Sequence, residues 1–314
     1  MQSRLSFNKY LVACLGLLCC AVGVHAQYRT GGAASQPVHS LSLSLGGGLS
    51  MTRSNWESES IDLRDKAGGA ALFGLSYEVS KKQFIFGVGV SVDYDYTRQR
   101  IDSFSDVFPR LDREGDSIYY AYRYRAYEDA QQRLSVSVPV YIGGYIGQYV
   151  YLLAGVKFSF PLLSSHNTET DLSTAGTYQR FIHTIENSPT YGYYPVDHYS
   201  YQESYDDAQW YLSPTLEIGS RFVLSRSVAM RIGAYAEYRF PFGGKAEYVL
   251  TDYSMVDENP HTLNQSNLRE NIRFHSVPTC SLQTKFPDYW TVGIKWTCQF
   301  MFRHKVKLCR CVAM

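Results

Sequence analysis

The stretch KKQFIFGVGVSVDYDYTRQR, residues 81–100, decides how this chain folds. From Phe84 to Tyr96 every even position is apolar, whereas the odd positions include Asp93 and Asp95. Alternation with a period of two is the pattern of a β-strand with one apolar and one polar face. The question that follows is which face looks into the protein.

Seven further segments alternate in the same way, which predicts eight strands. They lie at 41–51, 70–79, 84–96, 134–146, 150–162, 210–224, 228–240 and 290–302. Short turns at 80–83, 147–149 and 225–227 alternate with long links, most of them rich in tyrosine and polar residues. This arrangement is typical of outer-membrane barrels. We therefore predict an all-β fold: an eight-stranded antiparallel up-and-down transmembrane β-barrel with short periplasmic turns and long extracellular loops.

The two faces of these segments differ in charge. One face carries no Asp, Glu, Lys or Arg, and all the charges lie on the other. A soluble lipocalin-like barrel would bury the apolar face and expose the charges to water, and it is the competing interpretation. Two features favour a membrane barrel: small residues line the charged face, and aromatic side chains flank the apolar face at both ends. This predicted aromatic girdle consists of Phe84, Phe86, Tyr94, Tyr96, Trp210, Phe222, Tyr238, Phe240, Trp290, Phe300 and Phe302.

The predicted lumen holds five acidic and five basic residues. They are Glu78, Asp93, Asp95, Glu217 and Glu237, with Lys157, Arg221, Arg231, Arg239 and Lys295. Buried charges persist when they are paired and hydrogen-bonded, and the lumen of an eight-stranded barrel is just filled by side chains. We therefore expect an ion-pair network that plugs the interior, with pairings that the sequence leaves open.

The first 26 residues predict that the chain is exported. A basic start, an apolar run to Val24 and small residues near Ala26 are typical of a secretory signal peptide. We predict a signal peptide at 1–26, a periplasmic segment at 27–39, the barrel at 40–302 and a periplasmic tail at 303–314. The net charge of +1 gives no reason to expect a nucleic-acid partner.

One hairpin resembles a known family. The stretch LSVSVPVYIGGYIGQYVYLLAGVKFSFPL, residues 134–162, is similar to the central hairpin of the PorT-like outer-membrane β-barrel proteins of Bacteroidota. The shared features are Pro139 within the first strand, and Tyr149, Tyr151, Ala154 and Gly155 after the turn. The resemblance implies an outer-membrane barrel of undefined activity.

The sequence shows no catalytic motif. Histidines occur in the expected loops with acids nearby in sequence, but no nucleophile or paired spacing accompanies them. They are His166, His183, His198, His261 and His275, with Asp197, Glu203, Asp206 and Asp207. We expect no enzymatic activity, no cofactor and no metal site. A lipid-modifying enzyme with an active site at the rim, and a small channel, remain the alternatives.

Tyrosine-rich loops are the most distinctive extracellular feature. Tyr120, Tyr122 and Tyr124 keep the even parity of strand 134–146, so this strand is expected to extend beyond the membrane. Together with Tyr193 and Tyr194 they would form a binding surface, since tyrosine is enriched at interfaces. Solvated shielding loops are the alternative. The expected partners are outer-membrane lipid and an extracellular ligand or protein, and the barrel is expected to be monomeric. The function is expected to lie either in the extracellular loops or in a partner in the membrane or the periplasm.

Overall fold

A computed structural model describes residues 37–54, 61–111, 117–146, 149–180, 183–186, 195–205, 210–242, 249–253, 272–282 and 287–302. The predicted signal peptide and the tail at 303–314 lie outside these residues. Within the described part of the chain, no helix is long and apolar enough to cross a membrane.

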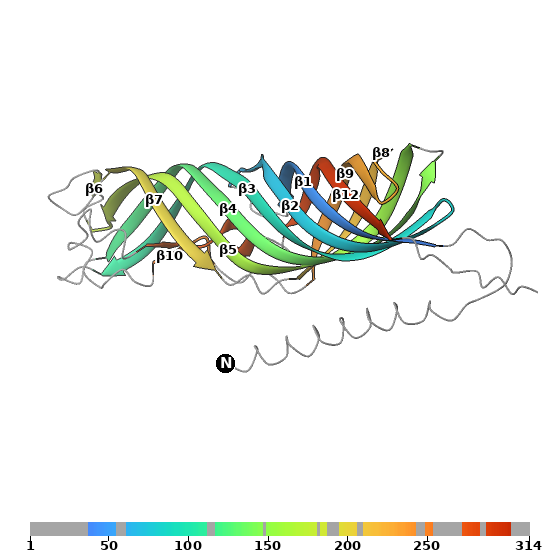
Figure 1. The fold of residues 1–314 in the computed structure, drawn as a ribbon. Coiled ribbons are helices and arrows are strands. Elements are labelled where there is room, and N and C mark those ends of the chain that lie inside the picture. The colour runs from blue at the N-terminus through green and yellow to red at the C-terminus, as the bar shows by residue number, and fades with distance from the viewer. Residues whose placement is uncertain are drawn as a thin grey trace, which may run out of the picture. The chain divides into compact units, whose positions relative to one another are not determined.

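Eight antiparallel strands close into a ring (Figure 1). They are β1 (Val38–Arg53), β2 (Leu63–Lys81), β3 (Phe84–Leu111), β4 (Ser117–Ile146), β5 (Val150–Tyr178), β8 (Trp210–Val223), β9 (Val228–Phe242) and β12 (Asp288–Phe302). Chain neighbours pair with each other, β5 pairs with β8, β9 pairs with β12, and β1 pairs with β12 to close the barrel. All eight predicted strands are confirmed, and so are the short turns at 80–83 and 225–227. The turn predicted at 147–149 lies mostly outside the described residues.

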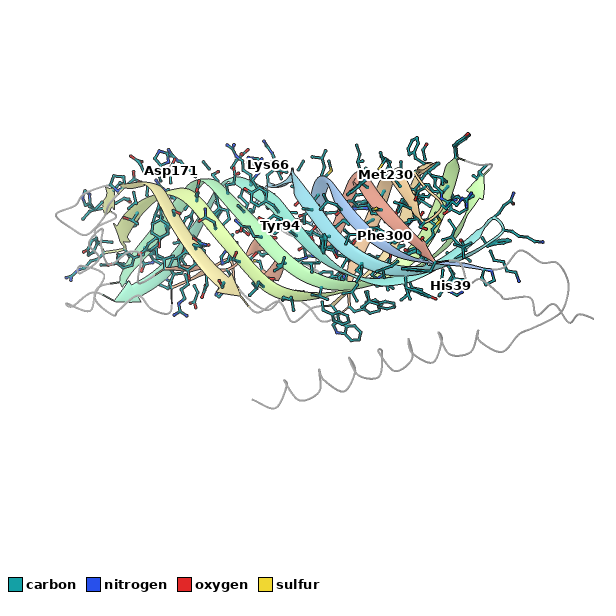
Figure 2. All side chains as sticks on the ribbon, in the orientation of Figure 1. His39, Lys66, Tyr94, Asp171, Met230 and Phe300 are labelled. Atoms are coloured by element: carbon teal, nitrogen blue, oxygen red, sulfur yellow. The ribbon has the colours of Figure 1, made fainter. Side chains whose placement is uncertain are left out.

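The outer wall of the ring is apolar and its interior is polar. On β3, Val90 is 53% exposed on the outside, whereas Asp93 on the opposite parity is 3% exposed. Tyr94 and Phe300, labelled in Figure 2, belong to the same exposed face. A soluble barrel would show the opposite arrangement, so the competing lipocalin-like interpretation is wrong.

Three strands run well past their predicted ends. The predictions stop β3 at 96, begin β4 at 134 and end β5 at 162, but the strands continue to Leu111, from Ser117 and to Tyr178. Two short strands, β6 (His183–Glu186) and β7 (Pro195–Tyr205), pair with the extended part of β5. A second sheet of β10 (Thr251–Asp252) and β11 (Arg273–Phe274) is followed by the 3-10 helix η3 (Val277–Thr279). We call the extended parts of β3, β4 and β5, with β6, β7, β10, β11 and η3, the extension.

The inward face changes parity where the barrel meets the extension. In β4 the register with β5 shifts between Arg125 and Glu128, and Ala126 within this bulge has a φ of 51°. In β5 a second shift leaves Leu162 and Leu163 both exposed. One extra residue in a strand turns every later side chain to the other face. Odd positions of β4 therefore face inward from Tyr127 through the barrel, and even positions face inward from Ile118 to Tyr124.

The extension has a hydrophobic core of its own. Side chains of β3, β4, β5 and β7 meet residues of the last long link there. The buried members are Ile101, Phe104, Ile118, Tyr120, Tyr122, Tyr124, Tyr127, Leu172, Val196, Tyr199, Leu250, Ile272, Phe274, Val277 and Cys280. The Phe274 ring lies 5.5 to 5.9 Å from the rings of Tyr124, Tyr127, Tyr199 and Tyr201. These centroid distances are normal for packed aromatic pairs.

Candidate functional site

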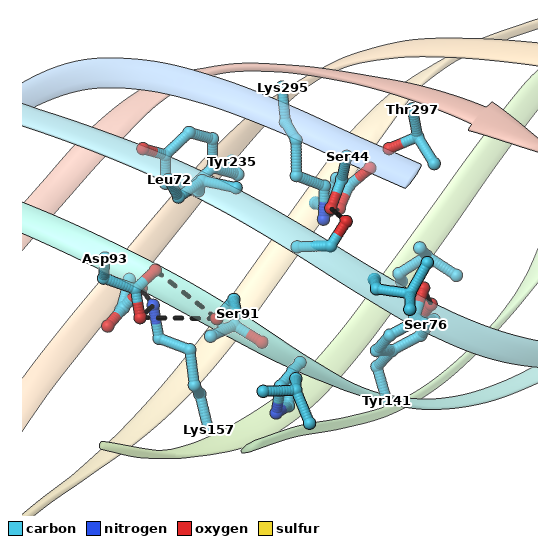
Figure 3. Close-up of a pocket in the computed structure, with 18 of the residues that line it drawn as sticks. Ser44, Leu72, Ser76, Ser91, Asp93, Tyr141, Lys157, Tyr235, Lys295 and Thr297 are labelled. Atoms are coloured by element: carbon cyan, nitrogen blue, oxygen red, sulfur yellow. Dashed lines mark hydrogen bonds and ion pairs between the residues drawn. The ribbon is translucent and has the colours of Figure 1, made fainter. Parts of the chain in front are cut away.

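The lumen contains a chain of alternating charges drawn from three strands. Lys157 of β5 contacts Asp93 of β3 at 3.3 Å and also pairs with Glu237 of β9. Arg239 contacts Glu237 at 3.1 Å and pairs with Asp95. Figure 3 shows Lys157 and Asp93 pointing toward one another within the barrel. Because the strands lie on different parts of the wall, these pairs tie the wall together across the interior.

Two more ion pairs lie nearer the short turns. Arg231 of β9 binds Glu78 of β2, which also accepts hydrogen bonds from Tyr141 at 2.7 Å and Gln299 at 2.6 Å. Lys295 pairs with Glu217, and the Tyr151 hydroxyl donates to the same carboxylate at 2.7 Å. Hydrogen bonds that satisfy the remaining lone pairs are what make a buried ion pair tolerable.

Nine of the ten predicted lumen charges therefore lie in ion pairs, and Arg221 is the exception. It forms no ion pair with a described residue, and its register partner on β9 is another cation, Arg231. The Arg221 guanidinium lies 4.7 Å from the Tyr145 ring centroid and donates to Met301 Sδ at 3.3 Å. A cation on an aromatic face is a weaker arrangement than a buried ion pair, so Arg221 provides a natural reference for the other nine.

Tyrosines also fill the lumen, which the sequence analysis missed. Tyr141, Tyr151 and Tyr235 point inward from the polar parity of their strands, and each is paired in register with a glycine of a neighbouring strand. At Gly87, opposite Tyr141, a Cβ would overlap the tyrosine ring. The signal for this packing was available: a tyrosine at polar parity, opposite glycine in the register.

A cavity of ≈ 80 Å³ remains between these side chains (Figure 3). Its lining includes Lys157, Glu217, Arg231, Glu237 and Lys295. One water needs about 10–15 Å³ by this kind of measure. The cavity therefore has room for a few waters among the charges.

Above the charge network, the interior is closed by further contacts. The Arg133 guanidinium lies between the rings of Tyr211 and Tyr289, 4.7 and 4.4 Å from their centroids. Beyond it Asp129, which is fully buried, accepts hydrogen bonds from Gln131 at 3.0 Å and from the backbone N–H of Val277 at 2.8 Å. The aromatic core of the extension follows.

The predicted tyrosine-rich binding surface is wrong for the residues that the structure describes. Tyr120, Tyr122 and Tyr124 are 4%, 2% and 0% exposed, because the bulge at Ala126 turns them into the core. The Tyr124 hydroxyl lies 2.6 Å from that of Tyr253, and burial raises its pKa well above the usual value. Tyr193 and Tyr194 lie outside the described residues.

The predicted aromatic girdle lies on the outer face. Its members at the short-turn end, such as Phe84 and Phe302, are exposed, and so are Trp210 and Trp290 at the other end. At that second end, aromatic pairs link neighbouring strands, with Tyr238 and Trp290 at a ring centroid distance of 4.5 Å. Phe86, Tyr94, Phe222 and Phe300 are also exposed, and Tyr96 and Phe240 are partly so.

Two of the histidines lie near one of the acids named from sequence: His166 is the register partner of Glu203 across β5 and β7, and the Glu203 carboxylate also acts on the pKa of His275. His166 lies on β5, not in a loop, and its Nδ1 is 3.3 Å from an oxygen of Asp129. Both side chains are buried, and Asp129 is committed to the η3 segment. His198 is 97% exposed and lies 3.8 Å from Asp171. His261, Asp206 and Asp207 lie outside the described residues.

A closed ring of eight antiparallel strands with an apolar exterior and a polar interior defines an integral β-barrel of the outer-membrane type. No model of a known protein family matches the chain. No curated protein is significantly similar to it in sequence.

Several solved outer-membrane proteins are similar in a structural comparison. Ail of Yersinia pestis, solved with the heparin analogue sucrose octasulfate, has 12% identity and a TM-score of 0.25, over 82% of this chain and 98% of that one. The protease OmpT of Escherichia coli has 10% identity and a TM-score of 0.24, over 87% and 99%. The translocator domain of the autotransporter NalP from Neisseria meningitidis has 8% identity and a TM-score of 0.18, over 95% of this chain and 98% of that one. At such scores these structures carry no information on function, and the fold assignment rests on the strand pairing.

Proposed function

We propose that this protein is a non-conducting outer-membrane barrel that anchors and displays the extension at the cell surface for a structural or binding role. The observation that carries the proposal is the filled interior. Ion pairs, then the Arg133 layer, then the aromatic core occupy the interior from the short turns outward. A pore would need a continuous polar path, and side chains that cross the interior at several levels argue against one.

Planar-bilayer recording of the refolded barrel tests the absence of a pore. We expect no large, stable open state at moderate voltage. Stable conductance by the unaltered barrel would contradict the proposal. Heat-modifiable migration on gels should first show that the preparation is folded.

Surface labelling of intact cells tests the display of the extension. His198→Cys places a thiol at a position that is 97% exposed on β7, and we expect a membrane-impermeant maleimide to label it. The matched variant Arg226→Cys lies in the exposed short turn between β8 and β9. It should be labelled only after the outer membrane is permeabilised. The reverse pattern would invert the topology.

The finer predictions from sequence belong to the same proposal. A cleaved signal peptide would export the chain, the girdle would anchor it in outer-membrane lipid, and the barrel would be monomeric. The PorT-like resemblance of residues 134–162 supports a place among the barrels of Bacteroidota. Ligands would be contacted by the outer surface of the extension and its loops, because Tyr120, Tyr122 and Tyr124 are buried.

We propose no enzymatic role. The buried pair of His166 and Asp129 has the residue types of a catalytic dyad, but it lies beneath the aromatic core. Asp129 there holds the Val277 backbone, and His166 packs against Tyr201 at a ring distance of 6.1 Å. This environment suits a structural pair that positions η3.

A further inference from the structure

A compact group of basic side chains lies on the outer wall, directly beyond the aromatic residues of β3. The outward face of this strand reads Val92, Tyr94, Tyr96 and then Arg98 and Arg100. On β2, Lys66 is paired in register with Arg98, and Arg64 with Arg100. Four cations therefore lie side by side on two strands. We call Arg64, Lys66, Arg98 and Arg100 the basic patch.

The position of the patch along the membrane normal follows from strand geometry. Between Phe84 and Tyr96 the strand rises about 40 Å at about 3.3 Å per residue, which a tilt of about 40° reduces to about 30 Å. This equals the thickness of a bilayer's hydrocarbon core, about 30 Å. By the same geometry Arg98 and Arg100 lie about 5 and 10 Å beyond Tyr96. The headgroup layer reaches about 5–7 Å beyond the hydrocarbon core, so Arg98 lies within this layer and Arg100 just outside it.

The patch is interleaved with carboxylates but stays accessible. Glu128 of β4 contacts Lys66 at 2.8 Å and Arg98 at 3.5 Å, and Asp102 contacts Arg64 at 3.0 Å and Arg100 at 3.2 Å. Arg64 also pairs with Asp62. The four cationic side chains keep between 34% and 60% of their surface exposed. Exposed pairs of this kind contribute little to stability, so exchange of a carboxylate for a stronger anion costs little.

The composition of the patch fits phosphate. Guanidinium groups bind phosphate oxygens through two parallel N–H bonds, and each keeps donors beyond those used by one carboxylate. Arg98 lies 5.9 Å from the Tyr96 ring centroid, which sets a cation at the boundary between aromatic and charged surface. On the far strands β8, β9 and β12 the corresponding ends carry aromatic side chains, among them Trp210, Phe242 and Trp290. The cations are thus localised on one side of the barrel.

We propose that the basic patch is a binding site for the phosphate headgroup of an anionic lipid in the outer leaflet. Acyl chains of the bound lipid would lie along the apolar wall below Tyr94 and Tyr96. The inference rests on the membrane-spanning fold and on the proposed position of the extension outside the cell. It is independent of whether the lumen conducts or the extension binds a ligand.

Native mass spectrometry of the detergent-refolded barrel, titrated with phosphorylated lipid A, tests the site. The variant Lys66→Gln/Arg98→Gln/Arg100→Gln should weaken lipid binding by at least about tenfold, since each cation near an anionic lipid contributes about fivefold. The control Arg123→Gln removes an exposed, ion-paired arginine farther out on β4, and binding should change less than about twofold. Heat-modifiable migration must be retained by every variant.

Two further arms sharpen the result. Glu128→Gln releases Lys66 and Arg98 from their shared carboxylate, so lipid binding should be maintained or strengthened. Weaker binding by Glu128→Gln, or equal binding by the triple variant and the unaltered barrel, would overturn the proposal. Inorganic phosphate should compete poorly because it lacks acyl chains. If excess inorganic phosphate displaces the lipid completely, the patch is a site for soluble phosphate and the lipid assignment is wrong.

Discussion

The barrel and the extension share three strands, yet their interiors are opposite in character. Inside the barrel β3 and β5 contribute charges such as Asp93 and Lys157, and β4 contributes uncharged polar residues such as Ser137. The apolar residues of all three strands face outward. Inside the extension the same strands contribute Phe104, Tyr124 and Leu172, and polar residues face water. The surrounding medium explains the difference: lipid surrounds the first region and water the second, so the apolar face turns toward lipid or away from water.

The change in which face of a strand points inward requires only one extra residue in each of two strands. One bulge residue in β4, Ala126, and one around Leu162 in β5 change which parity is inward. Tyr120, Tyr122 and Tyr124 share the even parity of the barrel's apolar face, so the bulge at Ala126 decides whether they contact lipid, water or core. The two interiors should therefore respond differently to substitutions.

The largest effect is expected from breaking the charge chain of the barrel. Arg239→Met leaves Asp95 and Glu237 without one of their partners in a buried site. We expect a loss of about 3–5 kcal/mol in the free energy of unfolding, measured by urea titration of the barrel in lipid vesicles. Neutralising the acids as well, in Asp95→Asn/Glu237→Gln/Arg239→Met, should recover much of the loss.

Arg221→Met is the matched control. It makes the same change on the same inward face, at a residue whose side chain contacts Tyr145 and Met301 and whose register partner is the cation Arg231. The expected cost is about 1 kcal/mol. If Arg221→Met and Arg239→Met lower the free energy of unfolding equally, the ion pairs of Arg239 add nothing to the stability of the barrel.

A smaller and local effect is expected in the extension. Phe274→Ala removes the ring at the centre of the aromatic core and should cost about 3 kcal/mol in the stability of the extension alone. Cys280 is fully buried in the same core, and burial raises its thiol pKa. Maleimide labelling of Cys280, with the other cysteines replaced by serine, should report the opening.

Val107→Ala is the reference for Phe274→Ala. Val107 also lies in the extension but is 60% exposed, so its truncation should leave labelling of Cys280 within about twofold. Heat-modifiable migration of the barrel should be unchanged in both variants. If Phe274→Ala unfolds the barrel as well, the two regions are one cooperative unit.

The sequence predicted the barrel well because its signal is repeated. Eight segments independently clear charge from one face, and no soluble arrangement explains the aromatic ends of that face. The ten lumen charges followed from the same parity. Their pairings did not, because Lys157 and Glu237 meet through the closure of the ring and not through neighbouring positions in the chain.

The continuation of β4 beyond the membrane was predicted and is confirmed, because the strand begins at Ser117. The burial of its tyrosines was not predicted, for a local reason. At Tyr120, Tyr122 and Tyr124 the even parity of β4 was carried through Ala126, where the backbone has a φ of 51°. Alanine gives no sign of a left-handed conformation, which glycine or asparagine would have suggested. The core also needs Phe274 and Val277 from a link that shows no strand pattern, so its partners became visible only in the fold.

The bulge itself gives the next prediction, with an effect of about 1–2 kcal/mol. Ala126→Val places a β-branched residue at positive φ and should destabilise the extension, whereas Ala126→Gly should be neutral or slightly stabilising. Ala130→Val, in the regular part of β4, is the control and should change little. The measurement is again Cys280 labelling. If Ala126→Val and Ala130→Val change Cys280 labelling to the same extent, the bulge at Ala126 is not the cause of the parity change.

The smallest expected effect is a pH dependence of the stability of the extension. Burial lowers the pKa of His275, with Glu203 and Asp252 opposing and His166 and Arg273 adding to this shift. The folded extension thus binds a proton less readily than the unfolded chain, whose histidine pKa is about 6.5. Its stability should be constant above about pH 6.5 and should fall as the pH drops through this value toward the folded pKa. The urea midpoint of the extension at several pH values checks this, and His275→Gln should flatten the dependence. An unchanged slope in His275→Gln would assign the acid sensitivity to another group of the core.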